Sequence, residues 1–140
     1  TTVITIGGNA VVGAWSTATG EALWRKDYSA SVDTSKLFTG TAASALSEGG
    51  FVIVQVGSDI QGGRVIALDP KTGVEKWTWT GKGPGYSSPS AFTIGGTRQI
   101  VTMTEGSIEG LDAKTGAGLW SIPFADDWHV LERTLGLLPR

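Results

Sequence analysis

The stretch ALDPKTGVEKW, residues 67–77, occurs in related form three times in this chain of 140 residues. The upstream copy is AWSTATGEALW (residues 14–24), and the downstream copy is GLDAKTGAGLW (residues 110–120). In each copy a Thr-Gly pair is followed by a Trp four residues after the Gly, and these glycines lie 53 and 43 residues apart. Self-similarity at about 40–50 residues, between strand-like flanks, indicates the blades of a β-propeller.

Short β-branched runs bounded by glycine predict an all-β protein of three antiparallel blades. The third repeat predicts four strands, at about residues 89–94, 98–104, 107–112 and 118–124. The second predicts four, at about 41–46, 51–57, 64–69 and 75–80. The first lacks its inner strand and predicts three, at about 3–6, 10–15 and 21–27. The blades are therefore expected at about residues 1–37, 38–81 and 82–125, followed by a tail, 126–140.

Each part of the central copy has a physical role in a tight turn that leads into a strand. The carboxylate of Asp69 can accept backbone N–H bonds and cap the turn, and the hydroxyl of Thr72 can do the same. Gly73 can take the left-handed conformation that such a turn requires. Trp77 then lies on the next strand, where its ring can cover the neighbouring blade. The motif is expected to join a turn within one blade to the packing between blades.

The three copies resemble the tryptophan-docking motif A-x-D-x-x-T-G-x-x-x-W of β-propellers related to pyrroloquinoline quinone-dependent dehydrogenases. The second copy matches at all five defined positions, which are Ala67, Asp69, Thr72, Gly73 and Trp77. The third has Gly110 in place of Ala and matches at the other four, which are Asp112, Thr115, Gly116 and Trp120. The first has Ser16 in place of Asp, a weaker cap, and keeps the other positions, which include Thr19, Gly20 and Trp24.

This resemblance covers about residues 1–125 and implies a three-repeat fragment of a propeller. The same repeat occurs in quinoprotein alcohol and glucose dehydrogenases and in a lipoprotein of the bacterial outer-membrane assembly machinery. It therefore implies a periplasmic or other extracytoplasmic location but no single activity. Quinoprotein dehydrogenases of this kind typically have seven or eight blades, a Ca²⁺ site and, in many alcohol dehydrogenases, adjacent cysteines. With three repeats and no cysteine, this chain is expected to bind no quinone cofactor.

The composition excludes several other classes of protein. A net charge of −2 provides no basic surface for nucleic acid. The apolar runs are only a few residues long, which is too short for a transmembrane helix. Without cysteine the chain has no disulfide, thiolate metal site or cysteine nucleophile.

Asp126, Asp127 and His129 form the densest cluster of side chains that could bind a metal or act as a base. The alternative reading is a polar strand entry with a surface histidine, and we favour it. His129 could also activate Ser87 or Ser88, although no G-x-S-x-G elbow is present.

The segment GKGPGYSSP, residues 81–89, lacks the spacing and the following helix of a phosphate-binding loop. It is predicted to cross between blades at the mouth of the channel, where Tyr86 and Ser87 are candidate ligand contacts.

Three blades leave two open edges, which is an aggregation hazard. We expect a second copy of the chain to complete a ring of six blades, as a homodimer. The tail at about residues 128–135 could supply the missing inner strand to the partner's first blade.

The leading functional hypothesis is a non-catalytic scaffold that binds a protein or small molecule at the ring face. The alternatives are an enzyme, with a hydrolase as the expected class and its site in the channel, and a propeller fragment without activity of its own.

Overall fold

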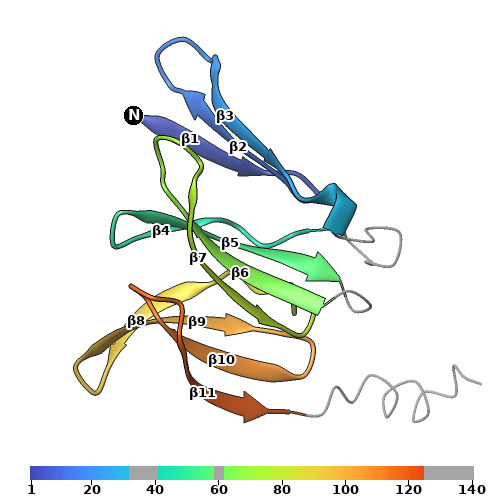
Figure 1. Ribbon diagram of the computed structural model, residues 1–140, viewed down its shortest axis with the longest axis vertical. Helices are drawn as coiled ribbons and strands as arrows, with labels where there is room; N and C mark the ends of the chain where they lie inside the picture. Colours follow the sequence, from blue (N-terminus) through green and yellow to red (C-terminus); the bar gives the residue numbers. More distant parts are fainter. Residues whose placement is uncertain (32–40, 59–61, 125–140) are drawn as a thin grey trace, which may run out of the picture.

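The computed structural model describes residues 1–31, 41–58 and 62–124. Within these ranges the chain forms three antiparallel β-sheets and one short 3-10 helix, η1 (Ser29–Ser31) (Figure 1). The predicted all-β fold of three blades is confirmed. No helix in this part of the chain is long and apolar enough to cross a membrane. The predicted boundary near residue 37 and the tail 126–140 lie outside the described residues.

Each sheet consists of strands that follow one another in the sequence and pair with their neighbours. Blade 1 contains β1 (Thr2–Ile6), β2 (Val11–Ser16) and β3 (Ala22–Asp27). Blade 2 contains β4 (Leu46–Glu48), β5 (Phe51–Ser58), β6 (Gly62–Leu68) and β7 (Glu75–Gly81). Blade 3 contains β8 (Ser90–Ile94), β9 (Thr97–Met103), β10 (Ser107–Asp112) and β11 (Gly118–Pro123). In the described residues, no strand pairs with the edge of β1 that faces away from β2, so blade 1 has no inner strand there.

The inner strand of blade 2 differs from its prediction at about 41–46. β4 begins at Leu46 and pairs with β5 over three residues. Upstream of it, the N–H of Thr41 donates to the carbonyl of Gly8 (2.9 Å), and the N–H of Ser44 donates to the hydroxyl of Ser88 (2.9 Å). Because these donors bond to blade 1 and to the crossover that leads into β8, this segment bridges the blades and does not extend the sheet.

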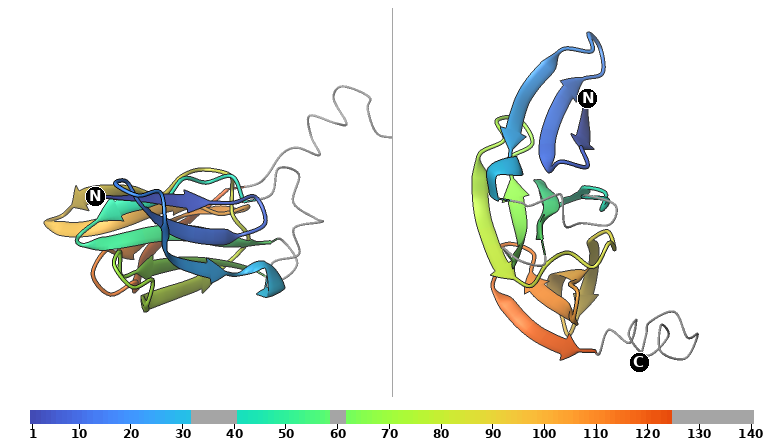
Figure 2. Two further views of the ribbon diagram at one scale, coloured as in Figure 1. Left: turned by 90° about the horizontal axis from the view of Figure 1, so that it is seen from above. Right: turned by 90° about the vertical axis from the view of Figure 1, so that its right-hand side faces the viewer.

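The three blades lie side by side in an arc (Figure 2). The inner strands β4 and β8 follow its concave side, where blade 1 has β1, and the outer strands β3, β7 and β11 follow its convex side. The two ends of the arc, which are blade 1 and blade 3, do not meet.

The hydrophobic core lies in two layers, one between each pair of neighbouring blades. The first layer joins blades 1 and 2, and its buried members are Ala10, Val12, Tyr28, Val52, Val54, Val56, Ile66 and Leu68. The second joins blades 2 and 3 through Ile53, Val65, Ala67, Ile100, Leu111 and Ala113. Alternate residues of β5 enter opposite layers because successive side chains of a strand point to opposite faces. Blade 2 is therefore covered on both faces, and blades 1 and 3 on one face each.

Candidate functional site

The motif turn of blade 2 is held by the side chain of Asp69. Its Oδ1 accepts hydrogen bonds of 3.0 Å from the N–H groups of Lys71 and Thr72. The hydroxyl of Thr72 accepts a third bond, of 3.3 Å, from the N–H of Val74. Gly73 has a φ of +70°, which favours glycine. The backbone bond from Lys71 is the main reason that the pKa of Asp69 lies below its ordinary value of 3.8.

The other two motif turns differ in the strength of their caps. Oδ1 of Asp112 accepts two backbone N–H bonds, of 3.0 and 2.8 Å. In blade 1 the hydroxyl of Ser16 takes this place and accepts bonds of 3.3 Å from the N–H groups of Ala18 and Thr19. The neutral oxygen makes longer bonds than the carboxylates, because an ionised acceptor binds N–H groups more strongly.

Trp24, on β3, lies against the motif turn of blade 2. Its indole Nε1–H donates a 3.0 Å hydrogen bond to the carbonyl oxygen of Pro70. A Cβ on Gly73 would lie 2.8 Å from Cδ2 and Cε3 of Trp24, so only a residue without a side chain fits beneath the ring. Gly73 is accordingly buried. We call this arrangement a Trp–Gly contact.

A second Trp–Gly contact joins blades 2 and 3. A Cβ on Gly116 would overlap Cε3 of Trp77, and Gly116 is buried. The indole Nε1 of Trp77 is buried without a hydrogen-bond partner among the described residues. The two contacts therefore share the ring-on-glycine packing and differ in the hydrogen bond.

Trp120 of the third motif copy and Gly20 of the first copy make no such contact with another blade of the arc. Trp120 lies over Gly110 of its own blade, where a Cβ would overlap Cε2 of the indole. Its Nε1–H donates a 2.7 Å bond to Oε1 of Gln99. Gly20, at the other end of the arc, is exposed, and no atom lies within 4 Å of the position of its missing Cβ. Each end of the arc thus carries one half of a Trp–Gly contact.

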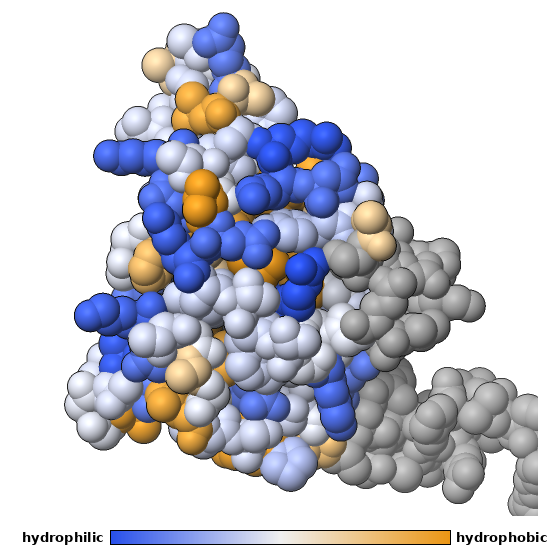
Figure 3. Space-filling view, viewed as in Figure 1, coloured by the Kyte–Doolittle hydropathy of each residue, from blue (hydrophilic) through white to orange (hydrophobic). Residues whose placement is uncertain are grey.

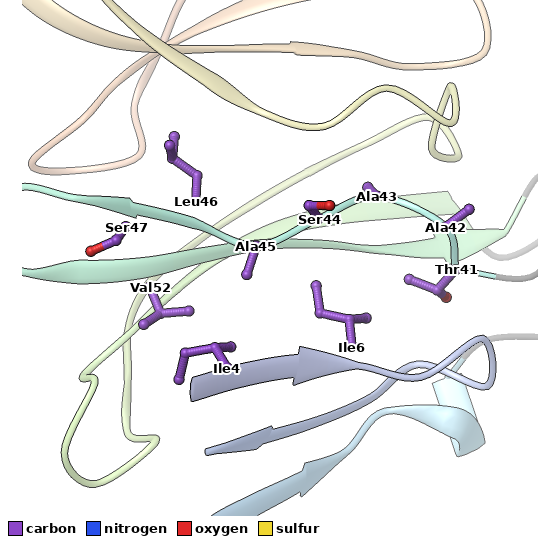
Figure 4. A pocket seen from close by; sticks show the side chains of 10 residues that line it. All are labelled: Ile4, Ile6, Thr41, Ala42, Ala43, Ser44, Ala45, Leu46, Ser47 and Val52. Atoms are coloured by element: carbon purple, nitrogen blue, oxygen red, sulfur yellow. The ribbon is translucent and has the colours of Figure 1, made fainter. Parts of the chain in front are cut away.

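A cavity of about 500 Å³ lies between β1 and the segment that leads into β4. Ile4 and Ile6 point into it from β1, and residues 41–47 form the opposite wall (Figure 4). Thr41 is 5% exposed, and its hydroxyl oxygen is buried without a hydrogen-bond partner among the described residues. The cavity is therefore lined by both apolar and polar side chains, with the hydroxyl of Thr41 buried in its wall. It lies beside the edge of β1 that has no partner strand among the described residues.

The predicted ligand contacts lie in the crossover between β7 and β8. Tyr86 is 44% exposed and has a φ of +58°, a conformation uncommon for residues other than glycine. The hydroxyl of Ser87 donates to the carbonyl of Ser88 (3.5 Å), and the hydroxyl of Ser88 accepts the bond from Ser44. The Ser88 hydroxyl thus has a structural role between blades 2 and 3.

The remaining predicted site residues, Asp126, Asp127 and His129, lie outside the described residues. The metal-binding and nucleophile hypotheses that use them stay predictions. In the part of the chain that the structure describes, no group of three or more His, Cys, Asp or Glu side chains could hold a metal ion.

A buried polar group between blades 2 and 3 was missed by the sequence analysis. Nε2 of Gln55 donates a 2.9 Å bond to the carbonyl of Met103, and the hydroxyl of Thr102 donates a 3.1 Å bond to Oε1 of Gln55. Gln55 is 1% exposed and interrupts the apolar run FVIVQV. A single amide within an apolar strand could have identified it, because a buried amide requires partners.

Two further polar contacts cross the boundaries between blades. Arg98 makes a bidentate ion pair with Glu48, of 3.0 and 2.6 Å, and these hydrogen bonds lower the pKa of Glu48. The hydroxyl of Tyr28 donates a 2.9 Å bond to Glu75, and Arg64 lies 5.2 Å from the centroid of the Tyr28 ring. Burial, followed by the bond to Glu75, raises the pKa of Tyr28. The first contact joins blades 2 and 3, and the second joins blades 1 and 2.

A model of the family described as outer membrane protein assembly factor BamB matches residues 1–130. The chain is 27% identical to quinohemoprotein alcohol dehydrogenase from Comamonas testosteroni, with a TM-score of 0.64, over 87% of this chain and 19% of that one. It is 24% identical to BamB from Moraxella catarrhalis, with a TM-score of 0.57, over 87% of this chain and 33% of that one.

A europium-containing methanol dehydrogenase is 18% identical, with a TM-score of 0.57, over 87% of this chain and 22% of that one. The chain therefore spans a third or less of each of these three structures. A comparison with curated proteins finds no match. The three consecutive blades and the match over residues 1–130 show that this chain belongs to the BamB family of β-propeller repeats, which resemble those of quinone-dependent alcohol dehydrogenases.

Proposed function

We propose that this chain is a non-catalytic β-propeller module that acts as a binding scaffold and completes its ring with a second copy of itself. Three blades from each chain would make a ring of six, within the range of known propellers. Two-fold symmetry would close both gaps with the same pair of faces. The observation that carries the proposal is the edge of β1 that no strand of the described residues pairs with, and an open cavity lies beside this edge.

In blade 3, the corresponding edge is covered by β8, which pairs with β9 over five residues. In blade 1 the backbone groups of β1 on that side have no partner strand in the described chain. An added strand would satisfy them and would place alternate side chains against Ile4 and Ile6. We propose that residues 128–135 of the second copy supply this strand, and that each chain provides it to the other.

The scaffold role requires a surface for a protein or small-molecule ligand. The crossover with Tyr86 and Ser87 supports a site at the face of the ring, because loops on a rigid propeller are suited to binding. The location that goes with this role is periplasmic or otherwise extracytoplasmic. No quinone is required, since the role includes no redox step.

Light scattering on the intact chain tests the closure. We expect a mass of about twice the 14.6 kDa of one chain. A monodisperse monomer at all concentrations would contradict both the ring and the strand exchange. Deletion of residues 126–140 is expected to weaken the dimer, and a Gly/Ser segment of equal length should not restore it. A dimer of unchanged stability after the deletion would contradict the exchange alone.

Metal analysis and a broad screen of ester and phosphoester substrates test the non-catalytic part. We expect no turnover. Activity that is lost in His129→Ala while the dimer stays intact would favour the hydrolase with a channel site and overturn the scaffold role.

A further inference from the structure

The chain contains two interfaces between neighbouring blades, which we call junctions. They show which residues the free faces at the two ends of the arc would contact in a further junction. On the receiving side of a junction, a cross-strand pair is buried beneath the preceding blade. In blade 2 this pair is Val52 with Leu68, and in blade 3 it is Ile100 with Leu111. Their exposed fractions are 3%, 0%, 0% and 0%. The motif glycine of each of these blades is buried as well.

Blade 1 carries the same receiving features, and they are exposed. The pair in the same register is Val3 with Trp15, and the two side chains are 49% and 38% exposed. Gly20 is exposed beside them. Apolar surface is visible near both ends of the arc (Figure 3). The free face of blade 1 therefore has the counterparts of the residues that are buried at the two junctions, but no blade of the arc covers them.

The other half is present on the free face of blade 3. In blade 2 the face that covers its neighbour includes Ile53, Val65 and Trp77. By register and repeat spacing, the counterparts in blade 3 are Val101, Ile108 and Trp120. Val101 and Ile108 line an open hollow of about 180 Å³. Blade 3, the last blade of the described residues, thus carries on its free side an apolar face of the type that covers a motif glycine.

Gly110 explains why Trp120 lies over its own blade. Cross-strand to each motif Trp is the first motif residue, which is Ala in blades 1 and 2 and Gly110 in blade 3. A Cβ at residue 110 would overlap the indole of Trp120. The missing methyl group therefore makes room for the ring, and Gln99 provides an acceptor for its N–H.

We infer that Trp120 has two docking positions. In the single chain it covers Gly110, and in the ring it covers Gly20 of a second copy. There the indole N–H would donate to the carbonyl of Thr17, which corresponds to Pro70 in the contact made by Trp24. The partner is a second copy of the chain, because each chain has one uncovered motif glycine, Gly20, and one motif tryptophan, Trp120, that covers no glycine of another blade. Two chains would therefore form two Trp–Gly contacts. This inference rests on the proposed ring.

Sedimentation equilibrium on three variants tests the inference. Trp120→Ala removes the docking ring. Gly20→Asn keeps a residue that tolerates a positive φ and fills the space where the ring would lie, with no clash in its own chain. Because the dimer would contain the junction twice, both variants should raise the dissociation constant at least about a hundredfold. Gly110→Ala should lower it, because it expels Trp120 from its position in the single chain.

Two matched controls separate these effects from general destabilisation. Val74→Ala removes an exposed apolar side chain of blade 2, and Gly118→Ala adds a methyl group to β11 without a close contact. Both should leave the dissociation constant unchanged. A dimer whose dissociation constant does not respond to Trp120→Ala and Gly20→Asn would overturn this inference and leave the ring standing. An unchanged or raised dissociation constant in Gly110→Ala would contradict the two docking positions of Trp120. A parent chain that is monomeric would overturn this inference together with the proposed ring.

Discussion

The indole N–H of Trp24 donates a 3.0 Å hydrogen bond to the carbonyl of Pro70, 46 residues further along the chain. This bond joins the outer strand of blade 1 to the motif turn of blade 2. The same motif in the next blade packs Trp77 on Gly116 but leaves its N–H without a partner among the described residues. The chain therefore provides a natural comparison of one contact with and without its hydrogen bond.

Replacement of each Trp by Phe should separate the bond from the packing. Trp24→Phe loses ring area and also leaves the Pro70 carbonyl without its donor, whereas Trp77→Phe loses ring area and removes an unpaired buried N–H. We expect Trp24→Phe to lower the free energy of unfolding by about 1–2 kcal/mol more than Trp77→Phe. Urea denaturation followed by circular dichroism measures both. Equal losses would show that the Trp24 hydrogen bond contributes nothing net.

Gly73 and Gly20 have nearly the same backbone conformation, with φ of +70° and +74°, but different surroundings. Gly73→Ala adds both the strain of a left-handed alanine and a clash with Trp24, and we expect a loss of about 2–4 kcal/mol. Gly20→Ala adds only the strain, and we expect about 1 kcal/mol. Both are measured by urea denaturation in a Trp120→Ala background, which keeps Gly20 free of a docked ring. A Gly20→Ala loss as large as that of Gly73→Ala would contradict the packing argument.

The buried amide of Gln55 should couple to Thr102 across the junction between blades 2 and 3. Gln55→Leu leaves the Met103 carbonyl and the Thr102 hydroxyl buried without this partner, and we expect a loss of about 1–3 kcal/mol. Thr102→Val removes one of these groups, so the double variant should lose less than the sum of the single losses. Additive losses in this double-mutant cycle would mean that the two side chains act independently.

The capping aspartates predict a dependence of stability on pH. The bond from Lys71 lowers the pKa of Asp69, and the hydroxyl of Thr115 lowers the pKa of Asp112, both from an ordinary 3.8. A carboxyl group whose pKa is lower in the folded state stabilises the fold above its unfolded pKa, and this contribution is lost as the pH falls through the folded value. The urea concentration at the midpoint of unfolding should therefore decrease as the pH is lowered from about 5 to about 2.

Asp69→Asn with Asp112→Asn tests the source of that dependence. The amide oxygens can still accept the backbone bonds but do not titrate in this range, so the fall below about pH 4 should become shallower than in the parent chain. An unchanged profile would assign the acid sensitivity to other carboxyl groups, such as Glu48 with its ion pair to Arg98.

The prediction from sequence succeeded where the signal is local. The positions of the strands around each motif depend on β-branched residues and on turns with glycine, and the four strands of blade 3 lie within two residues of their predicted bounds. It failed at β4, because the N–H groups of Thr41 and Ser44 bond to neighbouring parts of the fold that no local pattern reveals. The role of Ser88 was missed for the same reason, whereas Gln55 had a local signal in its single amide within an apolar strand.

The sequence by itself determined the repeat, the number of blades and the family, because a turn motif and the strand alternation around it are encoded within a few residues. The tertiary structure alone decided in which copies of the motif the glycine is covered by a tryptophan of the preceding blade. Gly73 and Gly116 are covered by a Trp, whereas Gly20 is open and Trp120 lies on Gly110. These differences arise because a contact between blades depends on what lies beside the repeat in space, and blades 1 and 3 each have one face with no neighbour in the arc.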